Sequence, residues 1–190
     1  MQNPNEQIAI LQKEIAEKQA TLKQLLKTKN PLDLSKFKLK DQEGNTVSVM
    51  DLFSETDQIM VIHNMGKSCV YCTLWADGFN GFNEHFNDRI PTFFVSPDDP
   101  QTQKEFASSR GWKFNMYSAH ESDLLKNIDF QTEKSGYLPG FSIFKKEGEQ
   151  VFQISKDYFG PGDNYCSIWH MFDMIEEGQN NWAPKYKYVK

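Results

Sequence analysis

GKSCVYCTLW, at residues 66–75, holds two of the chain's three cysteines in a C-x-x-C spacing. The apolar run at residues 58–63 precedes it and predicts a buried strand, while residues 69–88 carry a helix pattern. A helix that begins at the first cysteine would lower the pKa of the Cys69 thiol through its unpaired N–H groups and its positive end. We therefore interpret the pair as a redox dithiol, with Cys69 attacking and Cys72, about one helical turn away, resolving.

The same spacing is also half of a zinc site, but zinc takes about four ligands. The third cysteine, Cys166, and the four histidines show no metal-type pairing with the C-x-x-C. We therefore expect no metal, and thiol–disulfide exchange needs no organic cofactor. An incidental pair of buried cysteines remains the other alternative.

Three side chains beside the cysteines are candidate members of the site. Lys67 places a cation two residues before Cys69. Trp75 is expected to pack in the core. Asp77 lies one turn beyond Cys72 and could relay a proton from the resolving thiol, although a solvated carboxylate on the helix surface is an equal alternative.

Two further polar side chains have open roles. His63 ends the strand before the cysteines and could be a general base, but a structural, hydrogen-bonded histidine is the interpretation we favour. Cys166 begins the last predicted helix, and we expect it to lie far from the pair as a buried or half-exposed thiol.

The composition of the 190-residue chain bounds its partners and its location. The net charge of −5 argues against a general nucleic-acid-binding role. No apolar run approaches the roughly 18 residues that span a bilayer, and the polar N-terminus lacks the apolar region of a secretory signal. We therefore expect a cytoplasmic protein without a membrane partner, where a close cysteine pair is redox-active rather than part of a disulfide scaffold.

Residues 3–29 predict one long helix, with Asn3 as the cap and Pro4 in the first turn. Its apolar positions follow a spacing of three and four residues, interrupted by Lys18; they are Ile8, Leu11, Ile15, Leu22 and Leu25. The segment carries five lysines and three glutamates, so it is cationic against an acidic remainder. We divide the chain into a helical arm at 1–30 and a domain at 31–190. The arm either packs on its own domain or forms a homodimer.

The domain predicts an α/β fold. A hairpin at 37–49 precedes a strand–helix–strand unit at 58–63, 69–88 and 91–96, which is parallel and right-handed. A helix at 100–110, an irregular segment at 112–138, a hairpin at 139–155 and a helix at 165–177 follow. This is the order of a thioredoxin-like fold, a central mixed sheet with helices on both faces, extended by the N-terminal hairpin and the long helix.

Leu138 and Pro139 stand where thioredoxin folds carry a proline whose backbone pairs with the bound substrate. By analogy with those folds the Leu138–Pro139 bond would be cis, although X-Pro bonds are far more often trans. A proline that merely precedes a strand is the alternative. The analogy makes Leu138 and Pro139 candidate substrate-binding residues.

The motif CVYCTLWADGFN, at residues 69–80, resembles the thioredoxin-like family first catalogued as domain of unknown function 899. The stretches at 111–118, 139–144 and 169–174 agree, so the resemblance covers most of the chain. It implies a thioredoxin-like fold with Cys69 and Cys72 as the redox pair. Trp75 and Asp77 match the family motif without an assigned role.

The motif departs from two better-known relatives. The Trp-Cys-Gly-Pro-Cys of thioredoxin is replaced by Ser68 before the first cysteine and Val70-Tyr71 between the two, which would change the redox potential. Residues 65 and 66 are Met and Gly, and neither the Pro nor the Thr of the peroxiredoxin motif Pro-x-x-x-Thr-x-x-Cys is present.

These patterns favour a thiol–disulfide oxidoreductase. Its substrate would be a disulfide-bearing protein or a small thiol compound, and a separate thiol reductase would regenerate the dithiol. A peroxiredoxin-like peroxide reductase is the first alternative, indicated by the N-terminal hairpin and the 112–138 insertion. A non-enzymatic binding or assembly module with incidental thiols is the second.

Overall fold

The computed structural model describes residues 3–188. Its strands are β1 (Lys38–Lys40), β2 (Thr46–Ser48), β3 (Gln58–His63), β4 (Thr92–Ser96), β5 (Asn115–Ser118), β6 (Gln131–Thr132), β7 (Gly136–Tyr137), β8 (Gly140–Glu147) and β9 (Gln150–Tyr158). Its helices are α1 (Pro4–Leu26), the 3-10 turn η1 (Met50–Leu52), α2 (Val70–Gly81), α3 (Asn83–Arg89), α4 (Pro100–Arg110), α5 (Leu124–Asn127) and α6 (Ser167–Phe172). The first two residues of the predicted arm and the last two of the predicted domain lie outside the described residues.

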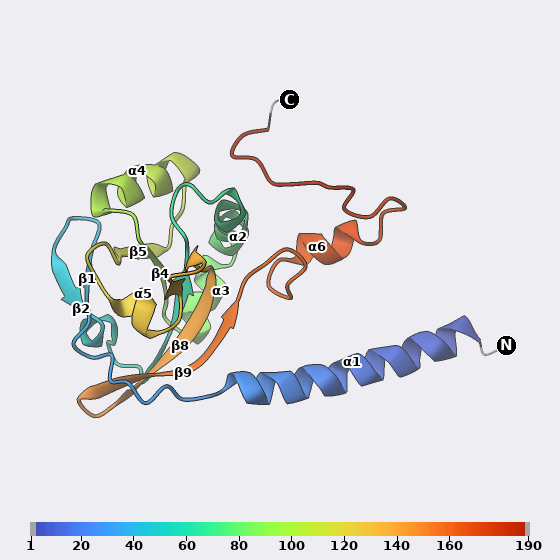
Figure 1. The fold of residues 1–190 in the computed structure, drawn as a ribbon, viewed down its shortest axis with the longest axis horizontal. Coiled ribbons are helices and arrows are strands. Elements are labelled where there is room, and N and C mark those ends of the chain that lie inside the picture. Colours follow the sequence, from blue (N-terminus) through green and yellow to red (C-terminus); the bar gives the residue numbers. More distant parts are fainter. Residues whose placement is uncertain (1–2, 189–190) are drawn as a thin grey trace.

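A seven-stranded mixed sheet in the order β2-β1-β5-β4-β3-β8-β9 forms the centre of the body, by which we mean residues 31–188 (Figure 1). β3 pairs in parallel with β4, and β4 with β5, which confirms the predicted parallel unit. β8 runs antiparallel to β3 and forms a hairpin with β9. The register places His63, at the end of β3, opposite Val95 of β4 and Gly140 of β8, so the dithiol follows β3 at the edge where Pro139 precedes β8.

The alternation of side chains along β3 divides the core into two layers. Ile59 belongs to the layer completed by α5 and η1, with Leu124 fully buried. Ile62 faces the other side and belongs to the layer completed by α2, α4 and α6, which includes Trp75 and Trp169. Because successive strand residues point to opposite faces, both faces of the sheet are covered by helices, as the sequence predicts.

Three helices differ from their predicted lengths. The arm helix, expected over 3–29, ends at Leu26. The helix expected over 69–88 is broken at Phe82, whose backbone (φ −100°, ψ 2°) leaves the helical region between α2 and α3. The last helix ends at Phe172 instead of 177. Beyond that point Met174 is 86 % exposed and Ile175 is 53 % exposed, so no core contact supports further helical turns. Within the segment expected to be irregular at 112–138, the polar stretch at 131–136 was expected as a loop and instead contributes to the short β6–β7 hairpin.

The arm projects away from the body and is joined to it at one end (Figure 1). After α1 the chain runs along the outer edge of β9, where Asn30 N–H donates to the Gln153 carbonyl at 2.8 Å and Leu34 N–H to the Val151 carbonyl at 2.7 Å. These bonds cover the edge strand. α1 itself buries no side chain, so the expected alternative of packing on its own domain is not what the structure shows. Within residues 3–188, no helix has both the length and the hydropathy needed to cross a membrane.

Candidate active site

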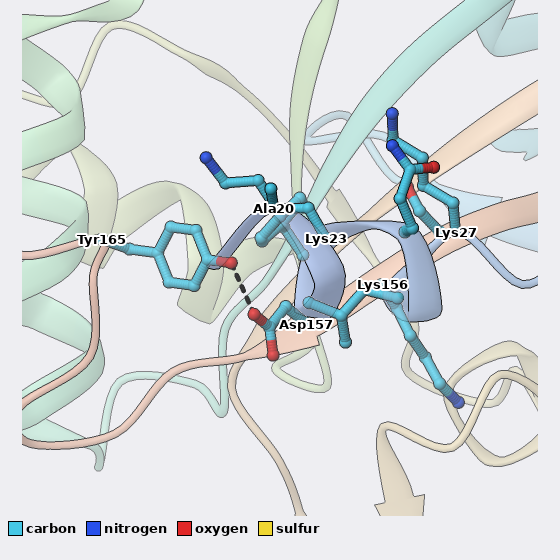
Figure 2. A pocket seen from close by; sticks show the side chains of 10 residues that line it. Ala20, Lys23, Lys27, Lys156, Asp157 and Tyr165 are labelled. Carbon is cyan, nitrogen blue, oxygen red and sulfur yellow. Dashed lines mark hydrogen bonds between the residues drawn. The ribbon is translucent and has the colours of Figure 1, made fainter. Parts of the chain in front are cut away.

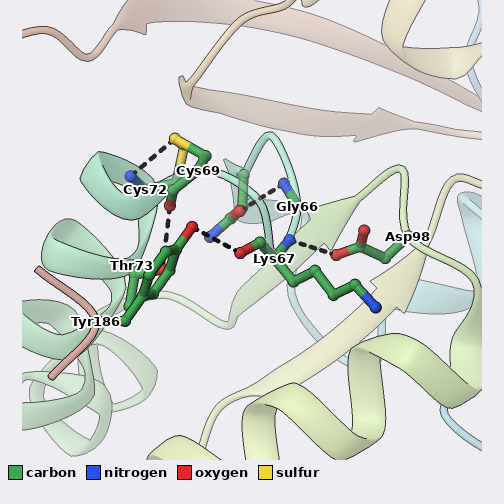
Figure 3. The surroundings of a disulfide bond; sticks show 8 residues. Gly66, Lys67, Cys69, Cys72, Thr73, Asp98 and Tyr186 are labelled. Atoms are coloured by element: carbon green, nitrogen blue, oxygen red, sulfur yellow. Dashed lines mark hydrogen bonds between the residues drawn. A yellow bond between two sulfur atoms is a disulfide. The ribbon is translucent and has the colours of Figure 1, made fainter.

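Cys69 is the N-cap residue of α2 and carries the geometry that the spacing predicts. Its backbone is extended (φ −94°, ψ 100°), and its Sγ accepts a hydrogen bond from the Cys72 N–H at 3.0 Å (Figure 3). The two cysteines are joined in a disulfide with a Cα–Cα distance of 5.2 Å. Sulfur therefore takes the place of the oxygen that usually satisfies an N-terminal amide of a helix.

The two sulfurs differ in their access to solvent. Cys69 is half-buried, whereas Cys72 is only 3 % exposed. Cys72 lines a small enclosed cavity together with Trp75 and Pro139. Trp75 is 3 % exposed and stacks on Phe159, which confirms its predicted place in the core. The exposed-first, buried-second order expected for an attacking and a resolving cysteine is thus present.

The loop before Cys69 is held by two side-chain acceptors. Asn64 Oδ1 accepts the Gly66 N–H at 2.8 Å, and Asp98 Oδ2 accepts the Lys67 N–H at 2.7 Å (Figure 3). Gly66 has a φ of +98°, and a Cβ at this position would lie 2.7 Å from Asp98 Oδ1. Only glycine allows both the left-handed backbone and the close approach of the Asp98 carboxyl.

Asp98 is a site residue that the motif analysis missed. It is half-buried in the turn after β4, and removal of its carboxyl from water raises its pKa, although the bond from the Lys67 N–H opposes that shift. A signal was available in the sequence, because loops that follow neighbouring parallel strands meet at the same sheet edge. Asp98 follows β4 as Gly66 follows β3.

Lys67 contributes through its backbone. The side chain was predicted as a cation beside Cys69, and the residue is exposed. Its N–H donates to Asp98, and its carbonyl accepts the Tyr186 hydroxyl at 2.9 Å. Tyr186 comes from the C-terminal tail and is the second neighbour that sequence reasoning missed, since 119 residues separate it from Lys67.

The Asp77 carboxylate is directed toward α4 and the segment that follows it. Its Oδ1 accepts hydrogen bonds from Arg110 Nε at 3.2 Å and from Trp112 Nε1 at 2.8 Å, and its Oδ2 pairs with Arg110 Nη2. Arg110 also donates to the Tyr186 carbonyl at 2.7 Å. These bonds give Asp77 a role in holding the tail near the dithiol loop, and a proton relay to Cys72 stays a prediction.

The Leu138–Pro139 bond is trans, so the cis geometry expected from fold analogy is wrong; residues 3–188 contain no cis bond. The backbone on both sides is engaged within the chain. Leu138 N–H donates to the Phe130 carbonyl, and the Pro139 carbonyl accepts the Phe159 N–H, both at 2.9 Å. The trans isomer has the lower intrinsic energy for an X-Pro bond. Substrate binding by Leu138 and Pro139 stays a prediction.

His63 is a structural residue of the core beside the site. Its Nε2 lies 2.8 Å from Ser142 Oγ, and Gln153 Nε2 donates to the same Oγ at 2.8 Å. The ring centroid of His63 lies 3.8 Å from that of Phe130, with the two rings tilted by 30°. Burial lowers the pKa of His63 to about 3, with a smaller contribution from the charge of Lys156. A group with this pKa is neutral at pH 7, and a general base at that pH would need a higher pKa.

Cys166 begins a helix that packs against α2. It is the N-cap residue of α6. The ring centroid of Trp169 in this helix lies 6.1 Å from that of Trp75 and 6.2 Å from that of Tyr71. The residue is half-buried and remains a thiol, and burial raises its pKa. A high thiol pKa keeps the reactive thiolate rare, which sets Cys166 apart from the pair at α2.

A family model described as "bacterial protein of unknown function (DUF899)" matches residues 10–190. No curated protein matches the sequence. Among solved structures, peroxidoxin BcpB from Mycobacterium tuberculosis is 17 % identical with a TM-score of 0.56, covering 69 % of this chain and 86 % of that one.

Two further structures of this kind are similar. Xanthomonas campestris peroxiredoxin Q is 16 % identical with a TM-score of 0.54 and coverage of 64 % and 78 % of the two chains. Reduced Prx3 from Vibrio vulnificus, in complex with H2O2, is 12 % identical with a TM-score of 0.57 and coverage of 70 % and 88 %. These likenesses confirm the predicted thioredoxin-like fold, which peroxiredoxins share.

Proposed function

The chain belongs to the DUF899 family of bacterial proteins, and from this premise we propose that it is a thiol–disulfide oxidoreductase whose reactive groups are Cys69 and Cys72. One observation carries the proposal. The half-buried Cys69 sulfur caps α2 and accepts the N–H of the buried Cys72, so the attacking atom sits at the positive end of a helix. The same interactions would favour a thiolate at Cys69 in the reduced protein.

In the first step the Cys69 thiolate attacks one sulfur of a substrate disulfide. A bond forms between Cys69 Sγ and that sulfur, the substrate S–S bond breaks, and the other substrate sulfur leaves as a thiolate that takes up a proton. The Lys67–Asp98 hydrogen bond and the Gly66 backbone hold the loop from which Cys69 emerges. We assign these groups to positioning.

In the second step the Cys72 thiolate attacks Cys69 Sγ and releases the second substrate thiol. The substrate disulfide is thereby reduced by two electrons, and the protein dithiol is oxidised to the Cys69–Cys72 disulfide, the state that the structure contains. A thiol reductase or a small dithiol then returns two electrons and two protons. A reducing compartment such as the cytoplasm supplies such donors, so we place the activity there.

Reduction of insulin with dithiothreitol as electron donor tests this proposal. We expect the wild-type protein to accelerate the reaction and Cys69→Ser to abolish the acceleration. Cys72→Ser should accumulate a mixed disulfide with the substrate, visible as an added mass that dithiothreitol removes. Cys166→Ser is the matched control and should keep full activity. Equal rates for wild type and Cys69→Ser would rule the proposal out.

A peroxide reductase is the second candidate, because the fold is similar to that of three peroxiredoxin-type proteins. In that reaction the Cys69 thiolate attacks one peroxide oxygen, and the O–O bond breaks with release of water or an alcohol after proton uptake. The resulting sulfenic acid condenses with the Cys72 thiol to give the disulfide and water. The missing Pro and Thr of the peroxiredoxin motif weigh against it. Peroxide consumption that requires Cys69, yet persists in Cys72→Ser with an added thiol, would favour this candidate over the first.

A further inference from the structure

The arm presents an apolar stripe to solvent. Along α1, five large aliphatic side chains are between 49 % and 70 % exposed at the stripe positions; they are Ile8, Leu11, Ile15, Leu22 and Leu25. A single 23-residue helix with this pattern gains most of its stability from packing of its apolar face. The stripe therefore requires a partner surface, and the question is which one.

The body of the same chain does not provide that surface. Where the arm comes closest, a cavity of about 430 Å³ separates the last turns of α1 from β9. Figure 2 shows Ala20, Lys23 and Lys27 contributed by the helix, and Asp157 and Tyr165 by the body. On the body side of this cavity, the Tyr165 hydroxyl donates a hydrogen bond to the Asp157 carboxylate at 2.5 Å. The hydroxyl therefore needs no hydrogen-bond acceptor from the arm.

The spacing of the stripe fits a helix pair. Ile8, Ile15 and Leu22 take position a of a seven-residue repeat, while Leu11, Lys18 and Leu25 take position d. Two such positions per seven residues form the narrow seam of a coiled coil, whereas a membrane-surface helix has a broader apolar face with aromatic residues. Lys18 is the one charged residue in this seam.

The charges of Lys18 and Glu14 favour an antiparallel over a parallel helix pair. In a parallel homodimer Lys18 would face Lys18 of the partner subunit across the seam, which is repulsive. In an antiparallel homodimer in full register, residue 15 lies opposite residue 18 and residue 8 opposite residue 25. The hole that receives Lys18 is then bordered by the partner's Glu14. Within the described residues neither Glu14 nor Lys18 belongs to an ion pair, so both charges are available.

We propose that α1 docks on α1 of a second copy of this chain as an antiparallel helix pair, closed at its centre by Lys18 and the partner's Glu14. The arm is attached to the body through residues 29–34, including an ion pair of 2.6 Å between Lys29 and Glu147. The helix that carries the stripe is therefore attached to the body next to β9. This surface and its occupant are independent of the redox chemistry.

Sedimentation of the full chain tests the proposal. We expect the wild type to have twice the 22.1 kDa of one chain at micromolar concentration. Leu11→Glu places a charge opposite the partner's Leu22, in an apolar layer of the seam, and should raise the dissociation constant by about 100-fold or more. Ala16→Glu is the matched control, because residue 16 takes position b of the repeat, outside the seam, so the same charge there should leave the dimer intact. Since α1 buries no side chain, neither change should disturb the body.

A charge exchange tests the orientation. Lys18→Glu alone should weaken the dimer by about tenfold or more, because it faces the partner's Glu14, and the double change Glu14→Lys with Lys18→Glu should restore it. A parallel pair would show no such restoration. A monomeric wild type, or a dimer that survives Leu11→Glu, would overturn the proposal. A monomer that instead sediments with anionic lipid vesicles would identify a membrane as the occupant and would also overturn it.

Discussion

Helices α1 and α2 both begin with a capping side chain, but α2 packs in the core whereas α1 is exposed to solvent. Asn3 caps α1 through a bond from the Asn5 N–H at 3.0 Å, and Cys69 caps α2 through a bond from the Cys72 N–H at the same distance. α2 is 12 residues long and buries Cys72, Thr73, Trp75, Ala76 and Phe79. α1 is nearly twice as long and buries none.

The two helices differ in what holds them in place. The core fixes α2, so the geometry at Cys69 follows from packing around Trp75 and from the loop that Asp98 holds. Nothing in the body fixes α1 beyond its attachment next to β9, so its place depends on what covers the stripe. A change in α2 should therefore alter the folding of one chain, whereas a change in α1 should alter association between chains.

Truncation of the central core residue of α2 should give the largest effect. Trp75→Ala removes a ring that contacts Phe159, Trp169 and Tyr71, and we expect a loss of about 3–5 kcal/mol in the free energy of unfolding. Urea denaturation measures it. Trp75→Phe is the control, because it keeps an aromatic ring and removes an indole N–H that has no hydrogen-bond partner among the described residues. A loss under 1 kcal/mol for Trp75→Ala would contradict the claim that packing fixes α2.

Gly66 tests the loop that leads into α2. Gly66→Ala combines a strained backbone with a Cβ 2.7 Å from Asp98 Oδ1, and we expect it to cost about 2–3 kcal/mol of stability. Gly111→Ala is the matched control. Its φ of +67° is also left-handed, but its Cβ would meet no atom within 4 Å, so it should cost about 1–2 kcal/mol. Equal costs would show that the Asp98 contact does not constrain the loop.

Acid should destabilise the body through His63. Its pKa is about 3 in the folded chain and near 6.5 when unfolded, so the unfolded state binds a proton first as the pH falls. The stability due to the neutral ring is present above pH 6.5 and is lost between about pH 6.5 and pH 3. From about pH 7.5 to about pH 5, wild type should lose about 2 kcal/mol more than His63→Gln, which cannot titrate. Denaturant unfolding curves of wild type and His63→Gln, recorded at both pH values, measure the two losses of stability. Identical losses would contradict the buried neutral state of His63.

The smallest effect on folding is expected in the arm. Leu22→Ala, made in the Leu11→Glu background so that association does not contribute, should change the free energy of unfolding by less than about 0.5 kcal/mol. Leu22 is 49 % exposed, and alanine is a good helix former. A cost comparable to that of Trp75→Ala would mean that the stripe packs on the body, and the contrast between the two helices would disappear.

The sequence predicted the elements whose signals are local. The strand predicted at 58–63, the start of a helix at Cys69 and the strand predicted at 91–96 each depend on neighbouring residues. All three are confirmed, the last over Thr92–Ser96. Gly78 and Gly81 were expected to weaken or bend the helix over 69–88, and α2 ends at Gly81. Past the break the ring centroid of Phe86 lies 5.7 Å from that of Phe79.

The parts of the candidate site that come from distant segments escaped prediction. Asp98 is 31 residues from Lys67 in the sequence, and Tyr186 is 119 residues away, so no spacing rule connects them to the C-x-x-C. The isomer at Pro139 was inferred from a related fold and was wrong, because backbone geometry is not transferred with topology. Periodicity identified the apolar stripe of α1 correctly, but periodicity carries no information about what covers a surface.

The hydrogen bonds that join the arm to β9 also determine when the arm can attach to the body during synthesis. The Leu34 N–H needs the Val151 carbonyl, and Asp33 Oδ1 accepts the Val151 N–H at 3.1 Å across 118 residues. The arm leaves the ribosome before β9, so its anchor cannot form until β9 has been made. Throughout that interval the arm has no attachment to the body, and neighbouring nascent chains on one messenger carry the same apolar pattern. Pairing of arms could therefore precede completion of the body.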